Sequence, residues 1–376
     1  MRIPFHKAHI TEDEVNAVSN TIRSGWLTMG PKTAEFEENF KHYIGCQYAV
    51  SLNSATAALH LALKAVNLQQ GDEVIIPTNT FIATAEVITY FNATPVLCDI
   101  EESTHNIDVK KIPKLITPKT KAIIPVHFAG QPCDMDELHE LANQHDLKII
   151  EDAAHAIPSS YKGTVIGNLK KTAITCFSFY ATKTLATGEG GMAVTNNETY
   201  AAKITTNRLH GINRDVWKRD QGKAGWKYDV IDNGCKYNST DLSSALGIVQ
   251  LNKQQYLKDK RSHIAHRYTE AFKNMKGIQI VEQKEDRESS YHLYVIKIDN
   301  RDKIINILKD NGINCSVHFI PVHLHSYYKN KFNYQSENYP VSNEVYKKSL
   351  SLPIYPDMTP EEIEYVISQV KQALGR

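Results

Sequence analysis

The sequence predicts an α/β protein, in which a large domain with a mostly parallel sheet is followed by a smaller C-terminal α+β domain. Two observations lead to this prediction. Short apolar runs alternate with amphipathic stretches between about residues 45 and 200, and several of these runs are continuously apolar. Continuous apolar runs are typical of strands buried on both faces, and strand–helix alternation over this length is typical of a parallel sheet covered by helices.

Seven apolar runs are the predicted strands of the large sheet, and they lie at residues 48–52, 73–77, 95–99, 122–127, 148–152, 175–179 and 192–195. The amphipathic stretches between them predict helices at residues 55–66, 82–91 and 135–145. Such helices cover the sheet because each one must bury its apolar stripe.

The pattern changes after Leu242. Apolar residues recur three and four positions apart over residues 243–274, which predicts one long helix joining two parts of the chain. Beyond it the sequence predicts a strand, a helix, a strand and a last helix, at residues 291–298, 303–312, 313–319 and 360–374. We place the domain boundary near residue 250, so that residues 1–250, with an N-terminal arm, form the large domain and residues 251–376 the small one.

The composition excludes several classes of protein. Hydrophobic residues make up 41% of the 376 residues, and 43 Lys and Arg nearly balance 42 Asp and Glu. These values argue against disorder, non-specific nucleic-acid binding and a polybasic membrane patch. No apolar stretch is long enough to span a membrane, and charges and a proline stand where a signal peptide needs an apolar run. We therefore expect a cytoplasmic protein with buried free thiols at Cys46, Cys98, Cys133, Cys176, Cys235 and Cys315.

A run of small residues follows the first predicted strand and begins a helix. Backbone N–H groups at a helix N-terminus, beside Ala55 and the hydroxyls of Ser54 and Thr56, could bind an anion such as a phosphate. The alternative is that Asn53 or Ser54 simply caps the helix.

Acidic residues end the predicted strand at residues 148–152. Asp152 lies at the carboxyl end of this buried strand, which is the edge of an open α/β sheet where ligands bind. A carboxylate there could hold a cationic ring nitrogen. The structural alternative is a solvated strand end or a helix cap.

The most specific stretch is FSFYATKTLATGEGGM, residues 177–192. Lys183 is flanked there by small, mostly uncharged residues and then by a glycine-rich run. Such a lysine can have a lowered pKa and act as an amine nucleophile, whereas the alternative is an ordinary surface lysine. An anion cradle, a partner for a pyridine nitrogen and an amine nucleophile are together what pyridoxal 5′-phosphate needs.

The chain resembles the DegT/DnrJ/StrS sugar aminotransferases, a family of the fold-type I, aspartate aminotransferase superfamily. The resemblance runs from about Pro4 to the C-terminus, through the motifs NSATAALHLAL, EDAAHA, FSFYATKTLATGEGGM, KYNSTDLSSALG and SVHFIPVHLH. It implies the fold-type I architecture of a PLP-dependent transferase. It also implies the cofactor pyridoxal 5′-phosphate (PLP), which alternates with its pyridoxamine form (PMP).

The resemblance implies a role for each matching residue. Lys183 matches the lysine that binds the cofactor covalently, and Asp152 matches the carboxylate that pairs with the ring nitrogen. His155 matches a position beside the ring, and Phe81 an aromatic residue that stacks on its face. The residues that match phosphate contacts are Ala55, Thr56, Ser178 and, from the neighbouring subunit, Asn238.

The asparagine match implies a homodimer with shared active sites. Residues 211–240, which lead to Asn238, lack a clear periodicity and form a long connection. Trp217, Trp226 and Tyr228 give this segment apolar anchors. We therefore interpret it as an interface arm.

Three histidines near the C-terminal end could suggest a metal site, but the spacing of His318, His323 and His325 is not that of a zinc site. No cysteine pair accompanies them, so we expect no metal. The resemblance instead places His318 and His323 near the substrate.

Two departures from the family pattern could alter the edge of the pocket: residues 157–160, and the pair Cys235 and Ser239 around the KYN element. Neither removes a cofactor contact. Dehydratases in the family have histidine in place of the lysine, so Lys183 favours transamination.

The expected reaction moves an amino group from an amino acid, by resemblance L-glutamate, to a nucleotide-linked 4-keto-6-deoxy sugar. The product would be a 4-amino sugar for a surface polysaccharide or glycan, such as lipopolysaccharide O-antigen. The alternatives are a 3-keto-sugar aminotransferase of the same family and a non-catalytic regulatory homodimer with the same fold. The intact Lys183, Asp152 and Ser178 argue against the regulatory protein, and an oxidoreductase would need a GxGxxG that the first strand lacks.

Overall fold

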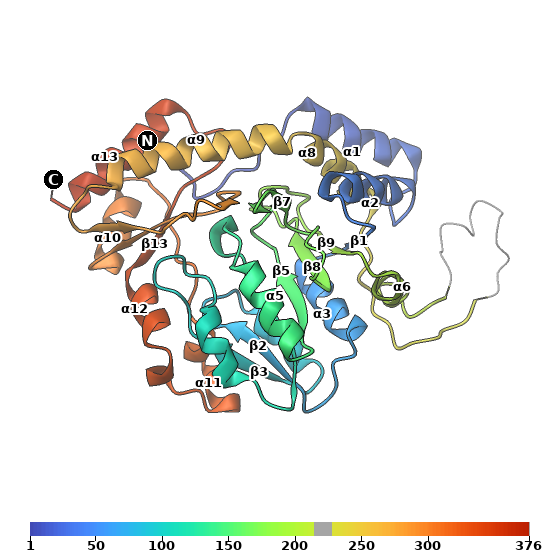
Figure 1. Cartoon of the computed structure of the whole chain (residues 1–376). Coiled ribbons are helices and arrows are strands. Elements are labelled where there is room, and N and C mark those ends of the chain that lie inside the picture. The colour runs from blue at the N-terminus through green and yellow to red at the C-terminus, as the bar shows by residue number, and fades with distance from the viewer. Residues whose placement is uncertain (214–227, 376) are drawn as a thin grey trace.

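The computed structural model describes residues 1–213 and 228–375. A large sheet with helices packed against it forms most of the molecule, and a C-terminal unit lies beside it (Figure 1). The long helix α9 (Gln254–Phe272) extends from this unit toward α8 (Asp241–Asn252), α1 (Glu12–Ser24) and α2 (Pro31–Ile44).

The large sheet has seven strands in the order β1-β9-β8-β5-β4-β2-β3. Strand β9 runs antiparallel to both its neighbours, and the other pairings are parallel. This arrangement confirms the predicted fold class. The strands are β1 (Tyr48–Leu52), β2 (Glu73–Pro77), β3 (Thr94–Cys98), β4 (Thr120–Ile123), β5 (Lys148–Asp152), β8 (Ile174–Ser178) and β9 (Gly191–Thr195).

Two apolar cores cover the two faces of this sheet. Successive strand residues point to opposite faces, so Ile149 enters one core and Ile150 the other. Helices α2 and α5 (Met135–Gln144) supply the first core. The second core is supplied by α3 (Ala55–Ala65), α4 (Ala83–Thr89) and α6 (Glu198–Asn207). Because both faces are buried, the strands read as continuous apolar runs in the sequence.

The single long helix predicted at residues 243–274 is wrong, because the chain forms two helices that meet at Lys253. Lys253 leaves helical geometry with φ −95° and ψ 0°, and its ammonium contacts Glu14 at 2.9 Å. Gln250 also donates to the Glu14 carboxylate, at 2.8 Å. The junction is thus fixed by α1, a contact between distant segments that the uninterrupted apolar periodicity does not reveal.

The C-terminal unit has its own core around a three-stranded antiparallel sheet, β10-β12-β13. Its strands are β10 (Ile278–Ile280), β12 (Tyr294–Ile298) and β13 (Ser349–Leu352). The helices of this part of the chain, besides α9, are α10 (Arg301–Asp310), α11 (Ser326–Phe332), α12 (Pro340–Lys348) and α13 (Pro360–Ala373). A further small sheet joins β11 (Arg287–Glu288) to β6 (Ser160–Tyr161) and β7 (Thr164–Val165) of the large part.

The strand predicted at residues 313–319 is wrong. Ile313 and Ser316 form only isolated bridges, to Ile3 and Ser351. His318 still contacts the small sheet, because its Nδ1 lies 2.8 Å from the Ser351 hydroxyl, and it lines the cavity described below.

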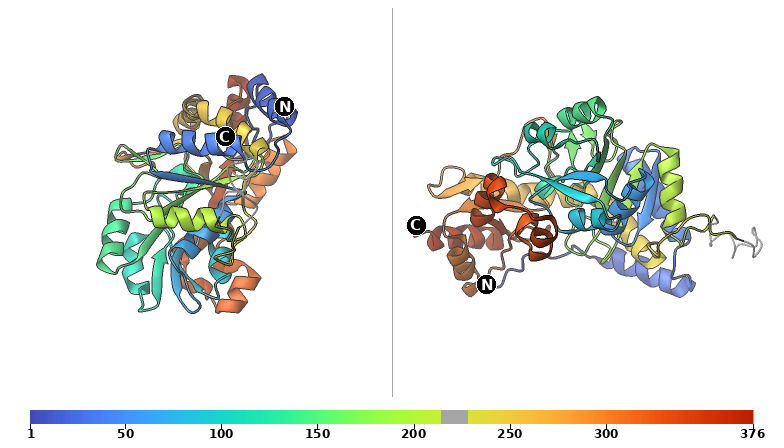
Figure 2. Two further views of the ribbon diagram at one scale, coloured as in Figure 1. Left: turned by 90° about the vertical axis from the view of Figure 1, so that its right-hand side faces the viewer. Right: turned by 90° about the horizontal axis from the view of Figure 1, so that it is seen from below.

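Residues near the N-terminus pack against the C-terminal unit. Ile3 lies in the core of that unit, and Figure 2 shows the N-terminus beside it. We propose that the domain boundary near residue 250 corresponds to the junction of α8 and α9.

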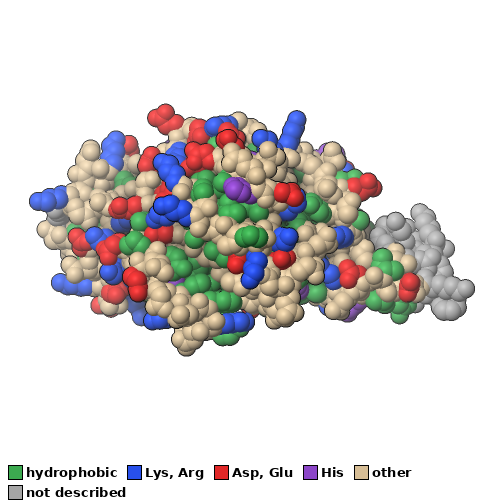
Figure 3. Space-filling view, turned by 60° about the horizontal axis from the view of Figure 1, so that its bottom comes forward, with side chains coloured by type: hydrophobic (Ala, Val, Ile, Leu, Met, Phe, Trp, Pro, Cys, Tyr) green, Lys and Arg blue, Asp and Glu red, His purple; other side chains and the backbone are tan. Residues whose placement is uncertain are grey.

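The charged side chains at the surface agree with the nearly neutral composition. Figure 3 shows acidic and basic side chains interspersed over the displayed face, without a large patch of one sign.

The six cysteines are free; Cys235 and Cys315 are half-buried rather than buried. Within the described ranges, no helix combines the length and the apolar character needed to cross a membrane.

Candidate active site

A cavity of about 520 Å³ lies where β5 and β8 end, and segments of the C-terminal unit complete its wall. The carboxyl edge of an open α/β sheet is the usual place for a ligand. The cavity brings together most of the predicted site residues, namely Ala55, Thr56, Phe81, Asp152, His155, Ser178, Lys183 and His318.

The N-terminus of α3 forms one wall of this cavity. Ser54 caps the helix by accepting a hydrogen bond from the Ala57 N–H at 3.1 Å, which confirms the capping interpretation. The first N–H groups of the helix, at Ala55 and Thr56, have no partner within the helix and carry its positive dipole end. A Cβ at Gly191 would lie 2.4 Å from the Ser54 carbonyl, so only glycine lets β9 approach so closely. This concave backbone can hold a phosphate beside Ser178.

Asp152 forms another wall, as the last residue of β5. One carboxylate oxygen accepts from the Thr84 hydroxyl at 2.8 Å, and the other from the Ala154 N–H at 3.2 Å. Burial raises the pKa of Asp152, and the positive charge of Lys183 opposes that rise. A buried carboxylate with so few donors is stabilised by a cationic partner in the cavity.

Lys183 enters the cavity from the turn that follows β8. The backbone N–H of Lys183 donates to the Tyr180 carbonyl at 2.8 Å. The backbone N–H of Thr187 donates to the Phe179 carbonyl at the same distance, and the two hydrogen bonds fix the turn. Burial lowers the pKa of Lys183 to about 8, although the charge of Asp152 acts in the opposite direction. Roughly a tenth of this amine is therefore neutral at pH 7, far more than for an ordinary lysine, and this fraction can act as a nucleophile.

Four imidazoles line the cavity around Lys183. The rings of His155 and His292 lie 4.3 Å apart, and Nδ1 of each is buried without a hydrogen-bond partner. Burial lowers the pKa of His318 to about 4 and that of His6 to about 3, so these rings are neutral near pH 7. Sequence reasoning missed His6 and His292, because only the folded chain brings these segments to the cavity.

Phe81 and His323 have contrasting positions. Phe81 is 60% exposed at the cavity, and its ring lies 6.1 Å from that of Phe319. His323 is not among the lining residues: its Nε2 lies 2.9 Å from the Asn343 amide oxygen, and its ring packs against Tyr339. No contact in the described chain supports the predicted role of His323 near the substrate.

Asn238 lies outside the lining of the cavity in its own chain. It pairs with Leu52 through an isolated bridge, and its amide donates to the Ser239 carbonyl at 2.9 Å. Tyr228 is exposed, whereas Trp217 and Trp226 lie outside the described residues. Among the residues that the structure describes, no three His, Cys, Asp or Glu side chains form a group able to hold a metal ion.

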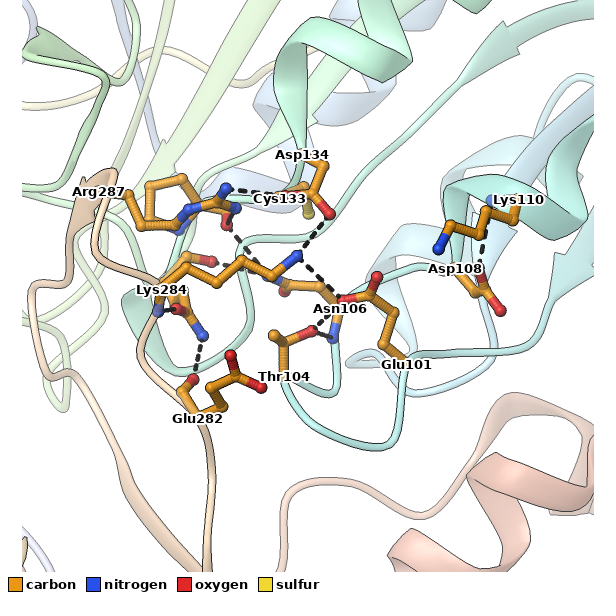
Figure 4. Close-up of polar contacts among 12 residues, drawn as sticks. Glu101, Thr104, Asn106, Asp108, Lys110, Cys133, Asp134, Glu282, Lys284 and Arg287 are labelled. Atoms are coloured by element: carbon orange, nitrogen blue, oxygen red, sulfur yellow. Dashed lines mark hydrogen bonds and ion pairs between the residues drawn. The ribbon is translucent and has the colours of Figure 1, made fainter.

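A polar network fastens the segment before His292 to the large sheet (Figure 4). Asp134 pairs with Arg287 at 2.8 Å and with Lys284 at 2.7 Å. Farther along the segment, the Ser290 hydroxyl donates to the carbonyl of His155. The cavity wall formed by the C-terminal unit is thereby held against the strand ends.

The donor set fits PLP: a backbone cradle for the phosphate, a buried carboxylate for the ring nitrogen and an amine for the aldehyde. Together with the seven-stranded sheet, these groups define a fold-type I transferase of the PLP-dependent class.

Comparison with known proteins identifies the family. The model of the DegT/DnrJ/EryC1/StrS aminotransferase family matches residues 8–371, and the chain belongs to this family. It is 48% identical to the protein MJ1066 of Methanocaldococcus jannaschii, over 99% of this chain and 98% of that protein. It is 44% identical to the spore coat polysaccharide biosynthesis protein SpsC of Bacillus subtilis, over 98% and 96%.

A solved structure described as a sugar aminotransferase, Spr1654 of Streptococcus pneumoniae in its PMP form, is similar with a TM-score of 0.93 and 36% identity. The match covers 99% of each chain. The aminotransferase PseC of Helicobacter pylori, involved in the biosynthesis of pseudaminic acid, matches with a TM-score of 0.92 and 28% identity over all of both chains.

Proposed function

We propose that this protein is a PLP-dependent aminotransferase that transfers the amino group of L-glutamate to a nucleotide-linked 4-keto-6-deoxy sugar. The product is a 4-amino sugar for a surface polysaccharide or glycan, such as O-antigen. The observation that carries this proposal is the position of Lys183 and Asp152 in one cavity with the helix α3 N-terminus. The relatives SpsC and PseC, whose names refer to spore coat polysaccharide and pseudaminic acid biosynthesis, support it.

Each wall of the cavity holds one part of the cofactor in this proposal. The N–H groups of Ala55 and Thr56 and the hydroxyl of Ser178 bind the phosphate. Asp152 pairs with the protonated ring nitrogen, and Phe81 covers one face of the ring beside His155. Bound there, PLP supplies an electron-accepting ring that stabilises charge developing on the α-carbon of the amino-acid donor.

Lys183 then acts as both base and acid. With PLP bound, its Nζ would take a proton from the donor's α-carbon and would deliver one to the cofactor, and it would move protons in the opposite direction when the keto sugar reacts. A pKa of about 8 suits both directions, since the two forms of the amine are populated near neutral pH. Because the imidazoles around Lys183 are neutral, burial and the negative charge of Asp152 determine the charge state of its amine.

A panel of nucleotide-linked sugars tests the substrate. Incubation with L-glutamate should convert the PLP form to the PMP form, followed by amination of 4-keto-6-deoxy sugars. NMR of the product should place the new amino group at C4. Amination of 3-keto sugars alone would contradict the proposed position and support the 3-keto alternative. The Lys183→Ala protein serves as the inactive control for the assay.

We also propose a cytoplasmic homodimer whose active sites each include Asn238 of the neighbouring subunit. Support comes from large apolar side chains that are exposed in the single chain, both at the cavity and on the segment before Asn238. Apolar groups exposed together on a surface mark interaction sites, and a second copy of the chain would cover these groups. They are Phe81, Tyr180, Tyr228, Val230 and Ile231.

Subunit exchange tests the shared site. Lys183→Ala and Asn238→Asp proteins should each be inactive, because the second variant brings a negative charge to the phosphate. After reversible dissociation and mixing, a mixed dimer has one site with both defects and one site with neither, so activity should return in part. Full activity of Asn238→Asp alone, or no recovery after verified exchange, would contradict the shared site.

A further inference from the structure

Behind Asp152 lies a short chain of buried hydroxyl groups. The Thr84 hydroxyl donates to Oδ2 of Asp152 at 2.8 Å. The hydroxyl of Thr80 lies 2.8 Å from that of Thr84. Because the single hydrogen of Thr84 is directed to the carboxylate, its oxygen accepts from Thr80. The order of donation is therefore Thr80 to Thr84 to Asp152.

Thr84 is not a wall of the cavity, although Thr80 and Asp152 are. It lies in the first turn of α4 and is fully buried, so water cannot replace its hydrogen bond. Apart from Thr84, one backbone N–H, that of Ala154, hydrogen-bonds the carboxylate, at 3.2 Å. Half of the hydrogen bonds that stabilise the ionised form of Asp152 thus come from one threonine.

We propose that Thr84 is a positioning residue, whose hydroxyl keeps Asp152 ionised and fixed in orientation toward the cavity. The inference rests on the proposed function, since it is the ring nitrogen of PLP that needs an anionic partner.

The effect of Thr84 depends on the interactions that set the ionisation of Asp152. Burial raises the pKa of this carboxyl, while Thr84, the Ala154 N–H, Lys183 and His127 lower it. Without the hydroxyl, the ionised form loses a charge-assisted hydrogen bond in a dry site. The proton shared with the ring nitrogen then moves toward Asp152, and the ring becomes a weaker electron acceptor.

The test removes the Thr84 hydroxyl while changing the rest of the side chain as little as possible. Thr84→Val keeps the shape of the side chain, Thr84→Ser restores the donor, and Thr84→Ala serves where valine prevents folding. The matched control is Thr89→Val on the same helix, because the Thr89 hydroxyl donates to the Glu86 carbonyl at 2.7 Å, away from the cavity. Each apo protein is loaded with PLP labelled with ¹⁵N in the ring.

In the wild-type, Thr84→Ser and Thr89→Val proteins, the ¹⁵N resonance should report a protonated ring nitrogen. In Thr84→Val it should move toward the unprotonated position, and the glutamate half-reaction should slow about 10- to 100-fold, as expected for loss of a hydrogen bond to a charged group. Wild-type resonance and rate in Thr84→Val or Thr84→Ala would overturn the inference, as would equal damage in Thr84→Ser. Failure of the wild-type protein to bind PLP would instead overturn the proposed function.

Discussion

Replacing Lys183 by alanine should abolish transamination, and borohydride should no longer attach the cofactor covalently to the protein. The reason is that the cavity offers a single amine among its lining residues in the described chain. In the proposed function, loss of this group would remove both the covalent attachment and the proton transfer. Single-turnover absorbance with L-glutamate, and mass spectrometry after borohydride reduction, measure the two effects.

The control for this variant is Lys148→Ala, since that lysine lies partly exposed at the start of β5 and, among the described residues, pairs only with Asp146, at 3.0 Å. It should keep full activity. Covalent attachment to any other lysine in the wild-type protein would show that Lys183 is assigned wrongly.

The pH dependence of cofactor capture follows from the same amine. The pKa of Lys183 is lowered from 10.5 to about 8, so its neutral, nucleophilic fraction rises with pH and reaches one half near pH 8. Below that value, capture of PLP by the apo protein should accelerate by about tenfold per pH unit, and above it the rate should level off.

Changing Asp152 to asparagine lowers kcat by about two powers of ten or more, although the two side chains have nearly the same shape. Asparagine still accepts the Thr84 hydrogen bond but carries no charge for a protonated ring nitrogen. The expected loss of activity therefore comes from the missing negative charge and not from altered packing. It should appear in kcat for both half-reactions, and the thermal stability of the apo protein should change little.

The neighbouring residue provides a matched control. Glu151 is buried on the opposite face of β5, where its carboxylate lies 2.7 Å from Nε2 of His127. Glu151→Gln should lower the melting temperature while leaving kcat near the wild-type value. Near wild-type activity in Asp152→Asn would mean that its carboxylate serves only the packing of the strand end.

The parts of the fold that depend on local pattern could be predicted from the sequence. The strand that ends at Asp152 and the helix that begins at Ala55 are marked by short apolar runs and small residues, and both are found where expected. The phosphate cradle and the lysine turn lie directly after such strands. Strand ends at one edge of a sheet necessarily meet, so their side chains could be grouped from sequence alone.

The features that were missed depend on contacts between distant segments. The break at Lys253 is set by Glu14, and the chain at residues 313–319 leaves its strand path to line the cavity. Thr84 acts through Asp152, far away in sequence, and no local pattern marks a hydroxyl that donates to such a partner. His6 reaches the cavity only because the arm containing Ile3 is anchored to the C-terminal unit.

The bridge between Ile3 and Ile313 has a consequence for biosynthesis of the holoprotein. The ribosome makes Phe5 and His6 long before His318 and Ile354, yet all four residues line the same cavity. A nascent chain that has already folded its large sheet still lacks this side of the cavity. The complete cavity therefore forms only after these distant segments of the chain have met.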